Sequence, residues 1–363
     1  MLKTINKLIW QQRRGFMRGF YFALLFLSLQ NMAFAEDLNA RWASFKDQFI
    51  SRQGRVIDWQ NNSMSHSEGQ GYVLLIAEEM NDRAAFDLVL GWSNHNLGEK
   101  LRAWSFGFDG KKWGVLDKNN ASDADIFHAW ALLRAGKKWN NAEYTKAGTE
   151  IMHAIREELI DKNNLLLPAK FGFQTENTTR INLSYYVFPA LPYFASIDKT
   201  HQKTWKALYD NAIKLYLDSL ATQENVAQLP PDWLTVDLEG KLKPFTENTL
   251  KTDAIYGFEA ICIPIYLAWA KDKKALEKLR PFIKRVSSDK STAQTIDLLN
   301  PQWKPAPPIF EGGIGHYAAL AKAAKTLGMS NEEKILWQLA DDARIKNQGN
   351  YYGEVLYLLA RIL

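Results

Sequence analysis

Three acidic side chains, far apart in the sequence, stand among residues that suit a catalytic cleft. Glu68 lies in Ser67-Glu68-Gly69-Gln70-Gly71-Tyr72, Asp123 in Ser122-Asp123-Ala124-Asp125, and Asp253 in Thr252-Asp253-Ala254. Two glycines and a tyrosine beside a glutamate would let the backbone and a sugar ring approach the carboxyl closely. Two carboxyls joined in one cleft can act as the acid and the base of glycosidic bond cleavage. The residue types therefore predict a hydrolytic site assembled from distant segments.

A purely structural interpretation of these acids is that they complement helix dipoles. Each stands at a predicted helix start, where roughly half a positive charge favours anions, and Ser67 and Ser122 look like N-caps. Capping alone would not select Gly69 and Gly71, because each costs about 1 kcal/mol relative to alanine inside a helix. Both interpretations stay open for any single acid, and the glycines favour the catalytic one for Glu68.

The helix dipole also sets a condition on Glu68. A general acid must keep its proton near neutral pH, so burial or a nearby negative charge must raise its pKa. Asp123 or Asp125 can supply that charge, but they lie about 200° apart on a helix, so only one of them can face the cleft. Asp253 has Lys251 nearby, stays ionised more easily and suits the base.

Aromatic side chains stand among and beside the carboxyl segments. Flat rings can stack on the apolar faces of sugar rings while polar neighbours bond the hydroxyls. For any given tryptophan, core packing is the competing interpretation. Trp104, Trp113 and Trp233 stand in loop-like surroundings rich in glycine or proline, where a binding role is favoured.

The elements that must position these residues are predicted to be helices. Apolar residues recur at helical spacing in twelve stretches: 39–50, 68–80, 83–97, 122–138, 141–160, 183–196, 200–222, 250–271, 273–285, 314–328, 330–345 and 351–362. Twelve helices make six helical hairpins, the inventory of an all-α (α/α)6 barrel. Glu68, Asp123, Tyr185 and Asp253 all fall at the starts of even-numbered helices, so we expect them to meet at one mouth of the barrel.

The N-terminal residues indicate export. Five basic residues precede an apolar run at 20–29, and Ala33-Phe34-Ala35 follows. This pattern is typical of a secretory signal peptide over residues 1–35, with an uncleaved anchor as the alternative. We therefore expect a periplasmic or secreted protein whose residues 36–363 form one barrel domain.

Composition excludes several other classes of site. The five basic residues of the leader account for the net charge of +5, which leaves 40 Lys and Arg against 40 Asp and Glu. No basic footprint for nucleic acid is present. Cys262 is the single cysteine, so no internal disulfide can form. The six histidines show no metal-ligand spacing, so we expect no metal.

The motifs resemble those of glycoside hydrolase family 8. The glutamate segment 67–72 matches its signature, and the likeness covers nearly all of residues 36–363. Further matching segments are Gly54–Asp58, Asn81–Asp87, Leu116–Asp125, Leu133–Trp139, Leu166–Pro168, Asn182–Tyr185, Pro231–Trp233 and Thr252–Ile255. Within the family, the chain resembles the periplasmic endoglucanases of bacterial cellulose-synthesis operons.

The resemblance implies an (α/α)6 barrel that hydrolyses β-1,4-glucan with inversion. Glu68 would be the general acid, Asp253 the general base, and Asp123 the aspartate that holds the distorted sugar, with Asp125 as the fallback. The residues expected to bind substrate are Gln70, Tyr72, Trp104, Trp113, Asp125, Arg180, Tyr185 and Trp233. No cofactor is implied, because carboxyls and water can carry both proton transfers. The expected partners are a β-glucan chain and a polysaccharide synthase machinery, with the protein itself a monomer.

The chain departs from the family around the base. The family commonly has Ser-Tyr before the base and an arginine three residues after it, whereas this chain has Lys251, Thr252 and Tyr256. Val73 also replaces a glycine. These departures indicate a diverged member that has lost an arginine beside its base.

Three alternatives to a β-glucanase stay open. The same residues could cleave another β-linked polymer such as chitosan or xylan, although a cationic polymer would need extra acids in the cleft. The protein could instead be a non-catalytic glycan-binding protein of the periplasm. A polysaccharide lyase is the weakest alternative, because it would need a Tyr/His or Arg pair for proton abstraction.

Overall fold

The structure is a computed structural model that describes residues 38–244, 253–307 and 310–362. The chain divides into two units, Met1–Lys46 and Asp47–Leu363, and each is described by itself. In the first unit, the described residues 38–46 are helical. The predicted signal peptide lies outside the described residues and stays a prediction. Over the described part of the chain, no helix is both long enough and apolar enough to span a bilayer.

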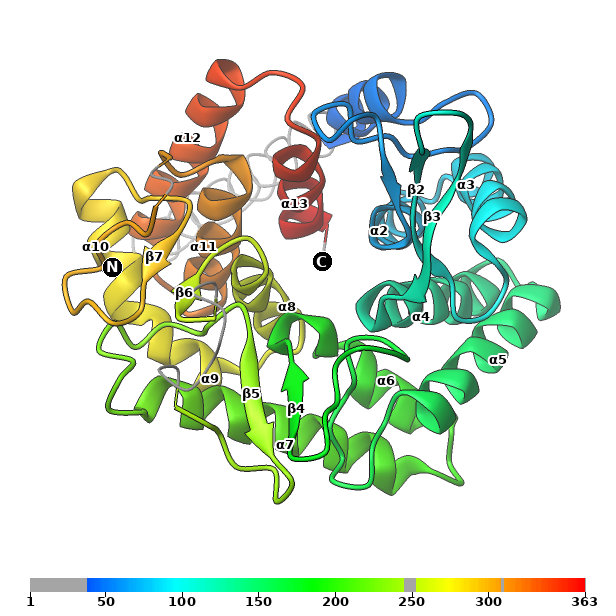
Figure 1. Ribbon diagram of the computed structural model, residues 1–363. Helices are drawn as coiled ribbons and strands as arrows, with labels where there is room; N and C mark the ends of the chain where they lie inside the picture. Colours follow the sequence, from blue (N-terminus) through cyan, green and yellow to red (C-terminus); the bar gives the residue numbers. More distant parts are fainter. Residues whose placement is uncertain (1–37, 245–252, 308–309, 363) are drawn as a thin grey trace, which may run out of the picture. The chain divides into compact units, whose positions relative to one another are not determined.

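Six inner helices form a closed ring in the described part of the second unit, each packed on the next directly or through a short 3₁₀ helix. They are α2 (Ser67–Glu79), α4 (Ser122–Lys138), α6 (Ala190–Ile197), α8 (Ile263–Trp269), α11 (Ile314–Thr326) and α13 (Tyr351–Ile362). The 3₁₀ helices η1 (Leu183–Tyr186) and η3 (Ala260–Cys262) complete the ring between α4 and α11. Figure 1 shows α2, α4, α8, α11 and α13 in this order around the ring.

Outer helices follow the inner ones along the chain and pack against them. They are α3 (Arg83–Leu97), α5 (Ala142–Glu158), α7 (Gln202–Ala221), α9 (Lys273–Leu276) with η4 (Glu277–Leu279) and α10 (Arg280–Asp289), and α12 (Ser330–Lys346). The first predicted stretch, 39–50, corresponds to helical residues 38–49. The alternation of inner and outer helices confirms the predicted (α/α)6 barrel.

The glycines of the Glu68 segment serve helix packing. A Cβ on Gly71 would lie 2.8 Å from Phe127 Cβ of α4, and a Cβ on Gly69 would lie 2.1 Å from the Tyr351 hydroxyl of α13. The two glycines therefore let α2 approach both of its neighbours in the ring. The expectation that they make room for a sugar was wrong, because protein side chains already occupy that space.

The N-caps predicted for the two inner helices were also wrong. Ser67 and Ser122 are the first residues inside α2 and α4, and their hydroxyl oxygens have no hydrogen-bond partner among the described residues. His66 and Ala121 occupy the cap positions without a side-chain cap. Glu68 and Asp123 therefore lie in the first turns of uncapped helices.

Short strands were not predicted, and they shape the loops around the inner helix starts. β1 (Ser65–His66), β2 (Ala103–Phe108) and β3 (Trp113–Asn120) form an antiparallel sheet in which β2 is central. β4 (Thr178–Ile181) pairs with β5 (Leu234–Asp237), and β6 (Ile255–Tyr256) pairs with β7 (Ile296–Asp297). β1 leads directly into α2, β3 into α4 and β4 into η1, so these strands set where the inner helices begin.

Three predicted helices are interrupted or shifted. The stretch 183–196 breaks at Val187, whose φ of 42° ends η1 before Pro189 precedes α6. The stretch 250–271 becomes a turn, β6, η3 and α8, while residues 250–252 lie outside the described residues. The stretch 273–285 divides into α9, η4 and α10. Asp253 consequently stands in a turn, and the expectation that it opens a helix was wrong.

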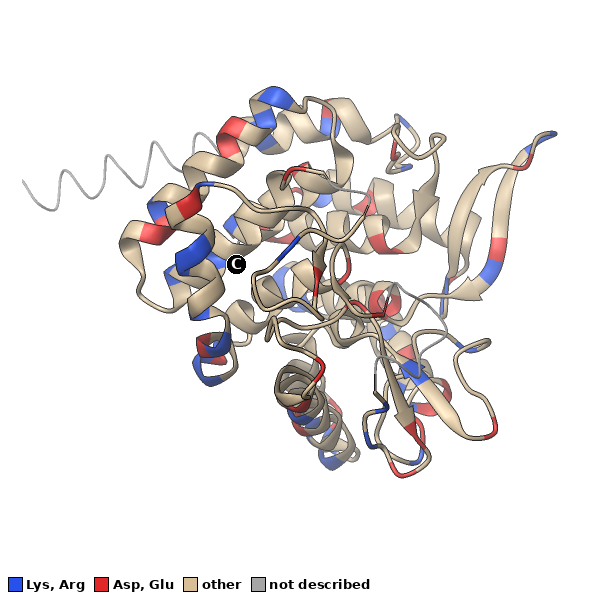
Figure 2. Ribbon diagram, turned by 60° about the vertical axis from the view of Figure 1, so that its left-hand side comes forward, with Lys and Arg blue, Asp and Glu red and all other residues tan. Residues whose placement is uncertain are grey.

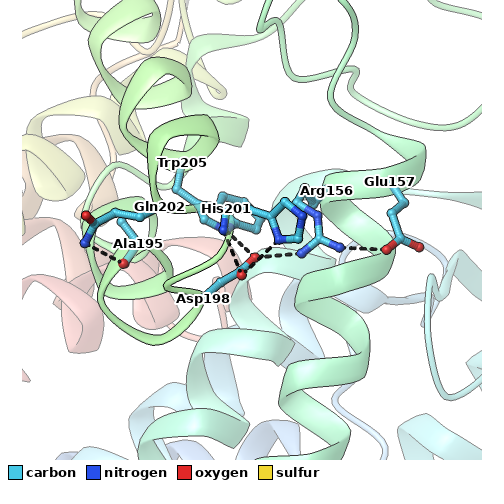
Figure 3. A network of polar contacts seen from close by, with 7 residues as sticks. All are labelled: Arg156, Glu157, Ala195, Asp198, His201, Gln202 and Trp205. Atoms are coloured by element: carbon cyan, nitrogen blue, oxygen red, sulfur yellow. Dashed lines mark hydrogen bonds and ion pairs between the residues drawn. The ribbon is translucent and has the colours of Figure 1, made fainter.

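A buried aspartate joins two outer helices to the segment that connects them (Figure 3). Asp198, which follows α6, accepts hydrogen bonds from Arg156 Nη1 at 2.6 Å and Trp205 Nε1 at 3.1 Å, and His201 Nδ1 lies 3.1 Å away. Burial alone would raise the pKa of Asp198, but the bonds from Trp205, His201 and Arg156 outweigh it and lower the pKa to about 2. The charged carboxylate therefore ties α5 to α7.

The charged residues are of mixed sign. In Figure 2 the Lys and Arg segments alternate with the Asp and Glu segments along the ribbon, and no single-sign stripe follows one element. This mixture agrees with the near-neutral charge expected for residues 36–363.

Candidate active site

A cavity of about 520 Å³ opens at the start of α2. Its lining comes from four sides of the ring and includes Glu68 and Tyr72 of α2, Glu259 before η3, His316 of α11, and Tyr351 and Tyr352 of α13. The predicted acid therefore lies at a cleft, and the cleft is rich in tyrosine hydroxyls and carboxyls.

Glu68 is half-buried among tyrosine hydroxyls. The Tyr72 hydroxyl donates a hydrogen bond to Glu68 Oε1, and this hydroxyl also lies 3.1 Å from that of Tyr266. Burial raises the pKa of Glu68, although the bonds with Tyr72 and Asp123 act in the opposite direction. The pKa of Glu68 is therefore shifted in the direction that a general acid needs, because burial outweighs these two hydrogen bonds.

Asp123 lies beside Glu68 with part of its bonding capacity unused. Its side chain is 3% exposed, and its Oδ1 has no hydrogen-bond partner among the described residues. Burial raises the pKa of Asp123 well above its usual value, and the charges of Glu68 and Glu259 add to this. An orphaned buried carboxyl oxygen is costly, so this atom is available to a ligand.

Asp253 faces a cation from a different element. Arg180 of β4 donates from Nη2 to Asp253 Oδ1 at 2.5 Å, and the Asp253 side chain is 4% exposed. The Arg180 guanidinium lies 4.4 Å from the ring centroid of Trp233, which in turn stacks on Phe173 at 5.7 Å and 5°. Arg180 therefore supplies a cation to Asp253, although position 256 carries no arginine.

Tyr256 itself belongs to the core. It is 2% exposed and its ring packs edge-on against Phe282 at 5.7 Å. The Tyr256 ring is therefore part of the core and supplies no charge to Asp253.

The segment between Asp253 and η3 is held by Asp232. Asp232 Oδ1 accepts hydrogen bonds from the backbone N–H groups of Gly257 at 2.8 Å and Ala260 at 2.9 Å, and the Asp232 N–H donates to the Ile255 carbonyl at 2.8 Å. Burial raises the pKa of Asp232 to about 7, against the lowering effect of these backbone bonds. The loop that carries the predicted base is therefore clamped at several points.

Glu259 is a site residue that sequence reasoning missed. Its Oε2 accepts a hydrogen bond from Asn182 Nδ2 at 3.1 Å, and it lines the same cavity as Glu68. Burial, followed by the charges of Glu68 and Asp232, raises the pKa of Glu259 to about 8. A usable signal was present, because Glu259 is a lone acid next to the apolar run 260–268 and acids are rarely buried without a role.

Four of the predicted binding residues lie near the carboxyls. Arg180 and Trp233 flank Asp253, and the Tyr185 ring lies 5.8 Å from that of Trp233. Tyr72 lies beside Glu68. Tyr72 therefore stands with Glu68 in the cavity, whereas Arg180, Trp233 and Tyr185 gather around Asp253, which is not among the residues that line this cavity.

Two further predicted binding residues lie on the β2–β3 hairpin. Trp104 is exposed and stacks on His66 at 5.6 Å and 4°, and His66 lines the cavity. Trp113 is exposed too, but one ring face is 4.4 Å from the Arg55 guanidinium. Trp104 therefore adjoins the cleft, whereas Trp113 belongs to a separate cluster with Arg55.

Gln70 and Asp125 were wrongly predicted to bind substrate. Gln70 is fully buried, with its amide bonded to the Val56 N–H at 2.7 Å and to Ser93 Oγ at 3.1 Å. Asp125 is also fully buried, and its two oxygens accept bonds from the Arg102 N–H at 2.9 Å and Asn120 Nδ2 at 2.8 Å. The polar atoms of both side chains are hydrogen-bonded to neighbouring segments, so neither side chain can reach a sugar.

Comparisons find similar proteins over most of the chain. Residues 16–362 match the family model described as glycosyl hydrolases family 8. An endoglucanase of Salmonella typhi is 30% identical over 336 residues, which cover 88% of this chain and 85% of that relative. An endoglucanase of Cellulomonas uda is 33% identical over 241 residues, which cover 65% of this chain. The solved structure of an endo-β-1,4-glucanase from Acetobacter xylinum is similar with a TM-score of 0.75 at 27% identity, and the match covers 90% of this chain and 97% of that one.

The match to the first relatives is shorter than their own length. The chain spans 64% of the Cellulomonas uda protein and 62% of a related endoglucanase of Escherichia coli (strain K12).

Proposed function

Because the chain belongs to the glycosyl hydrolases of family 8, we propose that it is an endo-β-1,4-glucanase that hydrolyses cellulose-like β-glucan with inversion. The observation that supports this most is the contrast between its two acids. Glu68 is half-buried beside Tyr72 and Asp123 with its pKa raised, whereas Asp253 forms an ion pair with Arg180. Carboxyls in such different surroundings can divide acid and base roles at one pH.

In the proposed reaction, Glu68 gives its proton to the glycosidic oxygen as the bond to the anomeric carbon breaks. Asp253 takes a proton from a water whose oxygen forms the new bond on the opposite face of the sugar. After one turnover Glu68 is a carboxylate and Asp253 is protonated, and exchange with solvent restores both. Asp123, with its orphaned oxygen, holds a hydroxyl of the sugar at the cleavage position.

Arg180 is assigned the role of holding Asp253 toward this water. Its guanidinium is fixed on one side by the Trp233 ring at 4.4 Å and on the other by Asp253 itself. A planar guanidinium holds a carboxylate in a defined direction. The altered neighbours of Asp253 in the sequence are therefore compatible with activity.

The test is reducing-end release from carboxymethylcellulose and other β-glucans by the native protein and by the variants Glu68→Gln and Asp253→Asn. We expect release by the native protein and a loss of at least about 10²-fold in each variant. Absence of release from every β-glucan would overturn the proposed activity, and release that survives Asp253→Asn would overturn the proposed base. The anomeric configuration of the first product, followed by NMR, tests inversion.

A second substrate is favoured by one observation. A cationic polymer would need extra acids in the cleft, and Glu259 is such an acid beside Glu68. Chitosan therefore belongs in the same assay. Faster release from chitosan than from carboxymethylcellulose would replace the proposed substrate while leaving the roles of Glu68 and Asp253 unchanged.

Export, a link to exopolysaccharide synthesis and a monomeric state complete the proposal. The basic and apolar pattern of residues 1–35 supports export. Cell fractionation with N-terminal sequencing tests it, and a mature N-terminus at Glu36 is the expected result. Light scattering of the purified protein tests the monomer, and co-purification with a membrane-bound polysaccharide synthase tests the association.

A further inference from the structure

A second cavity, of about 330 Å³, adjoins the cleft at the start of α11. It lies between α10, α11 and α12, which pack on one another. Four residues line both this cavity and the cleft: Gln294, Gly313, Ile314 and Asn350. The two cavities therefore meet along these residues, and the second one alone is large enough for a small ligand, since such pockets begin at about 300 Å³.

Gly313, at this boundary, has no structural reason to be a glycine. Its backbone is extended, with φ −94° and ψ −178°, a conformation that any residue adopts. A Cβ there would lie 3.7 Å from His316 Nδ1 and 3.8 Å from Gln294 Nε2, which are ordinary contacts, whereas a Cβ on Gly312 would lie only 2.6 Å from Thr292 Cγ2. Capping does not select glycine either, because Ser, Asn and Asp are better N-caps. The missing side chain at position 313 therefore leaves open space where the two cavities meet.

His316 holds the backbone on both sides of this opening. The Gly313 N–H donates to His316 Nδ1 at 3.4 Å, and burial lowers the pKa of His316 to about 4, so the ring is neutral at neutral pH. Its proton must then lie on Nε2, which donates to the Gln294 carbonyl at 2.9 Å. The opening is thus bounded by backbone that is already in place.

Side-chain amides at and beyond the boundary are available to a ligand. Asn350 Oδ1 accepts the Gly353 N–H at 2.6 Å, so its Nδ2 points away from that bond and has no partner among the described residues. The side chains of Gln294 at the boundary and Asn347 in the second cavity also have no hydrogen-bond partner within the described part of the chain. Amide groups both donate and accept, as the recognition of hydroxyl groups requires.

The charges around the second cavity indicate a neutral ligand. Lys290 and Lys346 line it together with Glu311 and Asp342, so the two signs balance. A phosphate or another anion would require an excess of cations. The ring of Phe310, 54% exposed, adds a flat apolar surface of the kind that stacks on a sugar.

We propose that the second cavity binds the continuation of a β-glucan chain whose neighbouring sugars lie in the cleft, and that the chain crosses between the two cavities over Gly313. The inference rests on the proposed β-glucanase function. A neutral chain of hydroxyl-bearing rings matches the unpaired amides, the exposed ring and the balanced charges of this cavity. It follows that the affinity for a glucan depends on whether the chain is long enough to reach the second cavity.

The test measures, by calorimetry, the affinity of the variant Glu68→Gln, in which hydrolysis is slowed, for cello-oligosaccharides from cellobiose to cellohexaose. A second protein adds Ala343→Leu, which places a larger side chain in the wall that α12 gives to the second cavity, at a residue that does not line the cleft. The matched control adds Ile345→Leu instead. It puts the same side chain on the same turn of α12, at a residue that is 70% exposed and does not line the second cavity.

We expect Ala343→Leu to weaken the binding of cellohexaose about tenfold and to leave that of cellobiose nearly unchanged. The added side chain displaces a sugar that is bonded to the amides, and each such hydrogen bond is worth about two- to tenfold in affinity. Gly313→Leu, which closes the opening itself, should weaken the binding of cellohexaose by a similar factor. The control should bind every oligosaccharide as the Glu68→Gln protein does.

Two results would overturn the inference. Equal binding of cellohexaose by the Ala343→Leu and Ile345→Leu proteins would show that the chain does not enter the second cavity. A loss for cellobiose as large as that for cellohexaose would place the effect in the cleft. If the proposed β-glucanase function itself is wrong, the Glu68→Gln protein will bind none of these oligosaccharides, which is distinct from binding that does not depend on length.

A measurement without these substitutions covers the case in which the variants do not fold. The side-chain amide signals of Gln294, Asn347 and Asn350 can be followed by NMR in the ¹⁵N-labelled Glu68→Gln protein. Cellohexaose should shift the signal of Asn347, which lines only the second of the two cavities, whereas cellobiose should not. An Asn347 signal that stays in place with saturating cellohexaose would exclude binding in the second cavity.

Discussion

A methyl group at Gly257 should impair catalysis by moving the loop that carries Asp253. A Cβ at this position would lie 2.6 Å from Asp232 Oδ2 and 3.3 Å from its Cγ. Real Cβ atoms essentially never come closer than 3.0 Å and ordinary contacts begin at 3.4 Å, so the loop or the carboxylate must move by about 0.4–0.8 Å. Asp232 cannot swing away freely, because its Oδ1 accepts two backbone hydrogen bonds.

The expected cost of Gly257→Ala follows from this displacement. A catalytic group misplaced by about 1 Å can lose about 10²-fold in rate, so we expect kcat to fall by about tenfold or more with a smaller change in KM. Overpacking of this size costs about 1–3 kcal/mol of unfolding free energy. Steady-state kinetics on carboxymethylcellulose and urea unfolding measure the two effects.

Gly91→Ala is the matched control for this prediction. Gly91 lies inside α3, and no atom comes within 4 Å of the position its Cβ would take. The control should leave kcat unchanged and stabilise the protein by up to about 1 kcal/mol, because alanine is the better helix former. If Gly257→Ala behaved like Gly91→Ala in both assays, the argument that Asp232 positions the base loop would be refuted.

Three further predictions concern single side chains. Tyr72→Phe removes a hydrogen bond that lowers the pKa of Glu68, so the alkaline limb of kcat/KM should move to higher pH; a downward move would contradict the assignment of Glu68 as the acid. Arg180→Gln should lower kcat at least about tenfold because Asp253 loses its orientation, and kinetics that match the native protein would show that Arg180 does not position the base. Asp198→Asn should cost about 2 kcal/mol of unfolding free energy at pH 7. Because the pKa of Asp198 is lowered, the difference between variant and native protein should vanish as the pH falls from about 4 through about 2. Urea unfolding at several pH values measures this difference, and a constant difference would exclude the charge of Asp198 as its source.

Much of the fold could be predicted from the sequence because helix periodicity is a local signal. The stretch 122–138 is confirmed in full as α4, and the outer stretch 83–97 matches α3. The predicted meeting of Glu68 and Asp123 at one mouth followed from the order of the helices alone. Both acids lie in first turns of neighbouring inner helices, and their pKa values depend on each other.

The predictions that failed depended on contacts between distant segments. Gly69 and Gly71 seemed to leave room for a sugar, but their free space is taken by Tyr351 and Phe127. Gln70 stands within the catalytic signature, but its amide is bonded to the backbone of the segment around Val56. All three contacted residues lie well outside the segment 67–72, so no local sequence pattern could show that Gly69, Gly71 and Gln70 serve packing.

The surroundings of Asp253 show why a change in a motif is weak evidence for a loss of function. The motif lacks an arginine at position 256, yet an ion pair needs only that a cation reach the carboxylate in space. β4 supplies this cation as Arg180, 73 residues earlier in the chain, and Trp233 holds the guanidinium in place. Tyr256 packs in the core against Phe282. Arg180 is therefore the cation that pairs with the proposed base, and the activity of this chain should depend on it.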